Sequence, residues 1–123
     1  MKSALTALVA AGVLTALLFG SVTPAHATTQ NRTQAVRAAK QYLEYQAFSL
    51  KGLVRQLKFE GYSTSDATYG ATHAGANWMK QAVKSAKAYL EYMPFSFSGM
   101  VSQLKFEGFT HAQAVHGARA AGL

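Results

Sequence analysis

The apolar positions of this chain recur at helical spacing in two separate stretches. In the first stretch they follow the i, i+4, i+7, i+8 order of one helix face, while the charged residues fall on the other side. This apolar face consists of Ala35, Val36, Ala39, Tyr42 and Leu43. The second stretch repeats the face at Ala82, Val83, Ala86, Tyr89 and Leu90. The pattern therefore predicts an amphipathic helix in each stretch.

Two shorter helices are predicted after each of these. Ser49 and Ser96 stand where helix N-caps are expected, each just before a second apolar stripe. Gly61 and Gly108 can end that second helix in the left-handed conformation. A third helix follows, with candidate caps and closing glycines at Ser63, Thr110, Gly75 and Gly122. Its small residues, which allow backbones to approach closely, are Ala67, Gly70, Ala71 and Ala74 in one stretch and Ala114, Gly117, Ala118 and Ala121 in the other.

The two stretches are copies of one unit. Residues 34–75 and 81–122 agree at roughly 24 of 42 positions without a gap, and the hexapeptide QLKFEG occurs in both, at 56–61 and 103–108. We therefore predict an all-α fold of two tandem three-helix repeats with helix-turn-helix character, after an N-terminal signal helix. The predicted domains are a signal peptide at 1–27, a first repeat at 31–75 and a second repeat at 77–123.

The N-terminus has the features of a secretory signal. Lys2 precedes a long apolar run that ends in the processing signal PAHA, so we expect Sec-type export with cleavage after Ala27. The alternative is an uncleaved signal that anchors the chain in the membrane, because the run falls only slightly short of the roughly 20 residues that a spanning helix needs. The predicted location is outside a bacterial cell or at its surface.

The charge balance is basic, with 12 lysines and arginines against 5 acidic residues. A basic helix-turn-helix protein suggests DNA binding. Yet the third helices, TSDATYGATHA and HAQAVHGARAA, are poor in the arginine, asparagine and glutamine that read base edges. We therefore expect no sequence-specific DNA binding. Attraction to anionic polymers of the cell envelope, or to acidic patches on another protein, fits the charge better.

No arrangement of residues in the sequence indicates a catalytic centre. His111 and His116 are five residues apart and fall on different helix faces, and no cysteine or carboxylate pattern completes a metal site with them or with His73. Glu60 and Glu107 are related by the repeat, which leaves paired acids for glycoside chemistry open, although nothing indicates a groove between them. We predict a protein that is not an enzyme and has no cofactor and no small-molecule substrate.

Candidate contact residues come from charged and aromatic positions. Glu60 and Glu107 fall in the last turn of a helix, where the dipole disfavours a carboxylate, so they either reach a positive partner within the repeat or face a binding partner. Tyr45 and Tyr92 follow charged residues and are expected to be exposed. The other paired aromatics are expected to fill the cores: Tyr42, Phe48, Phe59, Tyr62, Tyr89, Phe95, Phe106 and Phe109. The predicted partner-binding residues are Tyr45, Lys51, Arg55, Lys58, Glu60, Tyr92 and Glu107.

The tandem pattern A-x-x-YL…FS…L-x-x-QL-x-x-EG[FY][ST]…A, with W-x-x-QAVKSAKAYL opening the second copy, carries a family resemblance. It resembles the host cell surface-exposed lipoprotein (Ltp) family, many members of which are encoded by prophages. The resemblance implies two compact three-helix domains outside the cytoplasmic membrane, and an activity in superinfection exclusion. In that activity the protein stops a second phage from delivering its DNA, by binding injection machinery such as the tape measure protein.

Two features distinguish this chain from the lipoprotein members of the family. It contains no cysteine to carry a lipid, so it resembles a secreted or signal-anchored relative. It also has a positive rather than an acidic balance of charge. The alternative function that this charge favours is a cationic module that binds the cell envelope.

Overall fold

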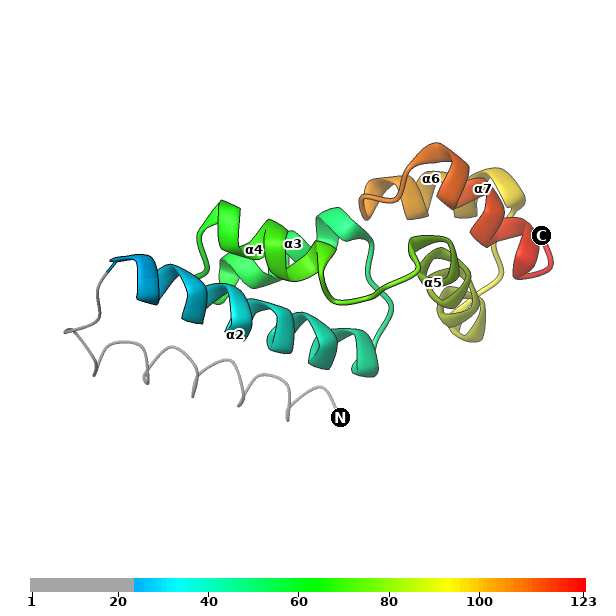
Figure 1. Cartoon of the computed structure of the whole chain (residues 1–123). Coiled ribbons are helices and arrows are strands. Elements are labelled where there is room, and N and C mark those ends of the chain that lie inside the picture. Colours follow the sequence, from blue (N-terminus) through cyan, green and yellow to red (C-terminus); the bar gives the residue numbers. More distant parts are fainter. Residues whose placement is uncertain (1–23) are drawn as a thin grey trace. The chain divides into compact units, whose positions relative to one another are not determined.

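The computed structural model describes residues 24–123, and throughout this range the regular structure is helical. Figure 1 shows the helices, labelled α2 to α7. Their bounds are Pro24–Tyr45 (α2), Leu50–Phe59 (α3), Thr64–Thr72 (α4), Trp78–Tyr92 (α5), Phe97–Phe106 (α6) and His111–Ala120 (α7). The all-α class and the tandem three-helix repeats are thereby confirmed, with α2 to α4 formed by the first copy and α5 to α7 by the second.

The predicted signal peptide at 1–27 lies largely outside the described residues. Its predicted cleavage point, after Ala27, falls within α2, which begins at Pro24. Proline suits the first position of a helix, because its ring fixes φ at a helical value and its missing N–H would have no partner there. From Pro24 onward, no helix combines the length and the apolar character that crossing a membrane requires.

Contacts between Cα atoms divide the chain into two compact units. Among the described residues, the first unit comprises 24–45 and Val54–Ala74, and the second comprises Gln46–Leu53 and Gly75–Leu123. In the first unit α4 packs along α2, and in the second α7 packs along α5 and also contacts α6. The first and third helices of each repeat therefore pack against each other in the same way.

Hydroxyl side chains begin four of the helices, at the positions predicted from the sequence. The cap of α7 is reciprocal: Thr110 Oγ1 accepts from the Gln113 backbone N–H (3.1 Å), and Gln113 Oε1 accepts from the Thr110 N–H (2.9 Å). The hydroxyls of Ser49, Ser63 and Ser96 each accept the backbone N–H three residues further on. A cap of this kind contributes about 1 kcal/mol, since it satisfies a backbone donor that the helix leaves open.

Both copies of QLKFEG end in the same turn. Gly61 and Gly108 have φ angles of 109° and 110°, in the region that residues with a Cβ rarely adopt. The residue after each glycine donates its N–H to the carbonyl of the leucine in the hexapeptide, at 3.2 Å in the first copy and 3.1 Å in the second. This Schellman ending stops α3 and α6 and turns the chain into the next helix.

Glycine and alanine bring the first and third helices of each repeat unusually close together. A Cβ placed on Gly70 would lie 2.7 Å from the carbonyl carbon of Ala35, and one placed on Gly117 would lie 2.7 Å from the carbonyl oxygen of Ala82. Real Cβ atoms essentially never approach other atoms so closely. The small residues of the third helices therefore do what their sequence predicted, which is to let two backbones pack directly on each other.

Within the second unit, the segment Gln46–Leu53 is tied to α5 and to the end of α6. The Phe48 backbone N–H donates to Gln81 Oε1 (3.1 Å), and the Ser49 hydroxyl donates to the carbonyl oxygen of Glu107 (2.7 Å). Ser49 and Gln81 are consequently buried. Ser49 thus has two roles, because its oxygen caps α3 while its proton holds the segment in place.

Candidate interaction site

The hexapeptide QLKFEG displays its side chains in the same way in both copies. Its leucine, Leu57 or Leu104, is fully buried in the core. Its lysine and phenylalanine are exposed, and its glutamine and glutamate are half-buried. Two side chains of the repeated hexapeptide, lysine and phenylalanine, therefore lie outside the core.

The glutamine ties the second helix of each repeat to the first. Gln56 Nε2 donates to the Tyr42 hydroxyl oxygen at 3.2 Å, and Gln103 Nε2 donates to the Tyr89 hydroxyl oxygen at 3.1 Å. Burial raises the pKa of both tyrosine hydroxyls above the usual value. Both tyrosines therefore remain neutral at physiological pH, and each serves as a fixed structural contact.

The glutamate turns back toward the repeat that carries it. Glu107 lies near two donors, the Ser85 hydroxyl at 3.4 Å and Gln103 Nε2 at 3.5 Å. In the first repeat Glu60 Oε2 is buried without a hydrogen-bond partner. Burial raises the pKa of the Glu60 carboxyl, and hydrogen bonding to Tyr42 partly opposes this shift. A partner-binding role for these two glutamates, predicted from the sequence, stays a prediction.

The phenylalanine corrects one expectation from the sequence. Phe59 and Phe106 were expected in the cores, but they are 82% and 83% exposed. The reason is helical geometry: two residues correspond to a rotation of roughly 200°, so the residue two positions after a buried leucine points away from the core. The spacing from Leu57 to Phe59 already contained this signal. We call Lys58–Phe59 and Lys105–Phe106 the exposed Lys-Phe pairs.

The other paired aromatics divide between the core and its edge. Tyr42 and Phe109 are buried, as expected. The half-buried members are Phe48, Tyr62, Tyr89 and Phe95. Tyr45 and Tyr92 were expected at the surface, and their side chains are 50% and 83% exposed. Whether these two tyrosines bind a partner stays a prediction.

The predicted basic contact residues share one face of α3. Lys51, Arg55 and Lys58 are all exposed and are separated by four and three residues, so they form a line along the helix that we call the basic stripe. The corresponding residues of α6 are Ser98, Ser102 and Lys105, also exposed. The two repeats therefore share the Lys-Phe pair, while the first repeat alone has two further cations beside it.

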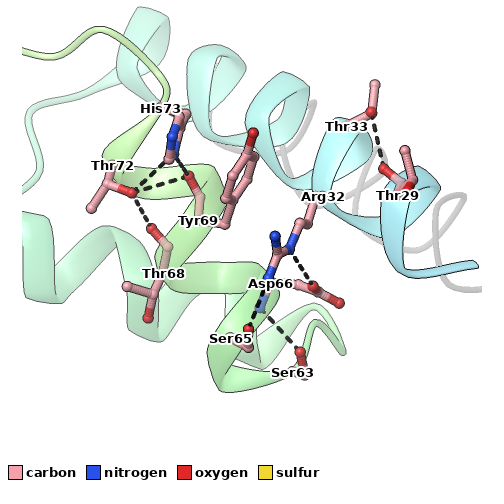
Figure 2. A network of polar contacts seen from close by, with 10 residues as sticks. All are labelled: Thr29, Arg32, Thr33, Ser63, Ser65, Asp66, Thr68, Tyr69, Thr72 and His73. Atoms are coloured by element: carbon pink, nitrogen blue, oxygen red, sulfur yellow. Dashed lines mark hydrogen bonds and ion pairs between the residues drawn. The ribbon is translucent and has the colours of Figure 1, made fainter. Parts of the chain in front are cut away.

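A cluster of polar contacts that no sequence motif predicted lies between α2 and α4 (Figure 2). Arg32 Nε lies 3.6 Å from Asp66 Oδ1, and the guanidinium carbon lies 4.8 Å from the centre of the Tyr69 ring. The Tyr69 ring in turn stacks on His73, with 3.8 Å between the ring centres. Asp66 is buried in the first turn of α4, where the helix dipole favours a carboxylate.

This cluster fixes α4 on α2, and it has no counterpart in the second repeat. The positions equivalent to Arg32 and Asp66 are Met79 and Gln113, and Gln113 is used for the capping box of α7. Arg32 and Asp66 are far apart in the sequence, and no motif joins them, so only the packing of α4 on α2 brings them together. An ion pair that fixes two helices is a structural role and indicates no reaction.

The remaining chemistry of the described residues is sparse. Within 24–123, no group of three or more histidine, cysteine, aspartate or glutamate side chains is placed to hold a metal ion. The hydroxyls of Ser49, Ser63, Ser96 and Thr110 cap helices, as the sequence predicted. The geometry thus offers exposed side chains for contact, in the basic stripe and the Lys-Phe pairs.

The chain is similar to a known protein family. A family model described as host cell surface-exposed lipoprotein matches the chain twice, at residues 30–73 and 77–118, and the two matches together cover more than half of the chain. They coincide with the two three-helix repeats described above. Searches among curated proteins and among solved structures found no match.

Proposed function

Because this chain belongs to the host cell surface-exposed lipoprotein family, we propose that it is an exported interaction protein without enzymatic activity that acts in superinfection exclusion. It binds the injection machinery of an incoming phage, such as the tape measure protein, and so prevents delivery of the DNA. The family description supports display at the cell surface. The mode of action and the partner are our proposal.

The observation that carries this proposal is the exposed Lys-Phe pair in each repeat. A phenylalanine ring that is more than four-fifths exposed contributes little to the stability of the fold, because it is not removed from water. Large rings of this kind are typical anchors of protein interfaces, where a partner supplies the pocket that removes them from water. Their presence at the same position in both copies indicates a contact surface that both repeats provide.

The proposal is tested by producing the protein in a susceptible bacterium and challenging the cells with phages that inject DNA through a tail. We expect plating efficiency to fall while phage adsorption stays unchanged, because the block acts after attachment. The double variant Phe59→Ala, Phe106→Ala should restore plating. Loss of a central ring weakens an interface by roughly 30-fold or more. Normal plating of the wild-type strain across a broad phage panel would contradict the proposal.

A matched control variant tests whether the effect belongs to the two phenylalanine rings or follows from removing any exposed apolar side chain. Met79 is also an exposed large apolar residue, but it lies on α5 and does not belong to the hexapeptide. Met79→Ala should leave exclusion intact. In parallel, the purified protein should retain a tape measure protein in a pull-down assay, and the double Phe variant should not. Equal effects of the Met79 and Phe variants on plating would show that these rings are not the contact.

A further inference from the structure

We infer that the basic stripe of α3, together with Phe59, binds the surface of an anionic lipid bilayer. Lys51, Arg55 and Lys58 are exposed on one side of the helix, and Phe59 follows at its C-terminal end. Seven residues at a rise of about 1.5 Å place the two lysines roughly 10 Å apart along the axis. This surface goes beyond the proposed phage contact, because the two extra cations exist only in the first repeat.

The charge on this helix has one sign. The sequence of α3, LKGLVRQLKF, contains three basic residues and no acidic one. The next acid along the chain, Glu60, is half-buried and turned toward Tyr42. Within 50–59, α3 thus contributes no carboxylate to the surface that carries the stripe. Basic residues near an anionic leaflet strengthen binding by about five-fold each.

The exposed phenylalanine ring favours a lipid bilayer over a purely ionic polymer as the partner. Phe59 is 82% exposed directly beside Lys58. Transfer of a phenylalanine ring from water to the boundary between lipid headgroups and acyl chains is favourable. A phosphate polymer offers no apolar region to receive the ring. Lysine and arginine next to such a ring keep their charges at the headgroup level while their aliphatic stems lie along apolar surface. The combination of a cationic line and a terminal aromatic ring thus fits a lipid surface.

The second repeat supplies an internal comparison. On α6 the same face carries Ser98, Ser102 and Lys105, followed by Phe106, which is as exposed as Phe59. Both helices thus offer a lysine and a ring, but α6 lacks the other two cations. We therefore expect α3, and not α6, to enter the interface of an anionic bilayer.

The experiment places a fluorescent probe at each ring in turn. The chain contains no cysteine, so Phe59→Cys and Phe106→Cys each create a single labelling site for an NBD probe, whose emission shifts to the blue in an apolar environment. The labelled proteins, as the bacterium exports them, are mixed with vesicles of phosphatidylcholine alone or with about 30% phosphatidylglycerol, a composition chosen to give the negative surface that basic residues recognise. We expect a blue shift at position 59 only with the anionic vesicles, weakened by high salt.

Matched charge changes test the role of the stripe in both directions. In the protein labelled at position 59, Lys51→Ser with Arg55→Ser should weaken binding by roughly 25-fold, as two cations are lost. In the protein labelled at position 106, Ser98→Lys with Ser102→Arg should create the blue shift that α6 lacks. All four positions are exposed, so the far-UV circular dichroism should stay unchanged.

Three results would overturn the inference. The first is a probe at position 59 that keeps its aqueous emission with anionic vesicles at low salt. The second is an equal blue shift at position 106 in the protein that keeps both serines. The third is tight, stripe-dependent binding of soluble poly(glycerol phosphate) without any blue shift on vesicles, which would assign the stripe to a polymer instead.

Discussion

The same hexapeptide, QLKFEG, closes both α3 and α6, yet the two helices present different surfaces. In both, the leucine is buried, the glutamine binds a tyrosine hydroxyl, and the phenylalanine points to solvent. One turn and two turns before the shared lysine, α3 carries Arg55 and Lys51, whereas α6 carries Ser102 and Ser98. These cations and serines all lie at exposed positions, so the exchange changes what each helix can bind.

The identical residues of the two hexapeptides fall into two groups, those that the fold uses and those that it does not. The leucine, the glutamine and the glycine recur because the fold uses them, in the core, in a hydrogen bond and in a turn with positive φ. The exposed lysine and phenylalanine recur although they contribute little to the core. Our proposed function assigns this recurrence to a contact that both repeats make, and our further inference assigns the residues that differ between α3 and α6 to a bilayer surface.

The largest expected effect comes from the buried leucines. Leu57→Ala and Leu104→Ala should each lower the free energy of unfolding by about 2–5 kcal/mol, because each change leaves a cavity at a fully buried site. Phe59→Ala and Phe106→Ala should change it by only about 0.5 kcal/mol or less, since these rings are exposed. Urea unfolding of the purified protein measures all four. A large loss for the phenylalanine variants would place the rings in a core and remove the basis of the comparison.

An intermediate effect is expected where the first and third helices touch. Gly70→Ala and Gly117→Ala each force a methyl group into the backbone of the facing helix, and overpacking of this kind costs about 1–3 kcal/mol. The two losses should be similar, because the two contacts are. Thr68→Ala, on the exposed side of α4, is the control and should change stability little. Thermal unfolding followed by circular dichroism tests this, and a gain in stability at either glycine would contradict the close approach.

The smallest effect concerns the half-buried carboxyl of Glu60. Burial raises the pKa of this carboxyl, so the ionised form is penalised in the folded state. The folded state therefore loses stability as the pH rises from the pKa of the unfolded chain, about 4.3, through the higher pKa of the folded state. Glu60→Gln cannot ionise and should therefore gain stability relative to the wild type between acidic and neutral pH, with the difference smallest at low pH.

Urea unfolding at a series of pH values measures this difference. Glu44→Gln, at an exposed position of α2, serves as the reference for removing one negative charge from the surface. A Glu60→Gln variant that becomes less stable than the wild type as the pH rises would show that the ionised carboxylate is favoured in the fold.

Much of the fold follows from short stretches of sequence. The apolar spacing predicted the helices, the hydroxyl at Thr110 predicted a cap, and Gly61 predicted a turn with positive φ. The candidate site was predicted less completely. The stripe of α3 was anticipated by residue type, while the exposed rings were placed in the core because aromatic residues usually lie there. The distance from Leu57 to Phe59 would have corrected this.

The sequence by itself determined the duplicated three-helix plan, because helix periods, caps and glycine turns depend on residues within a few positions of one another. Only the tertiary structure decided which distant groups meet. Packing of α4 on α2 formed the ion pair of Arg32 with Asp66, and the bond from Phe48 to Gln81 buried a glutamine whose counterpart in the first repeat, Gln34, is exposed. Such contacts depend on which helix faces pack together, and local sequence patterns do not specify that pairing.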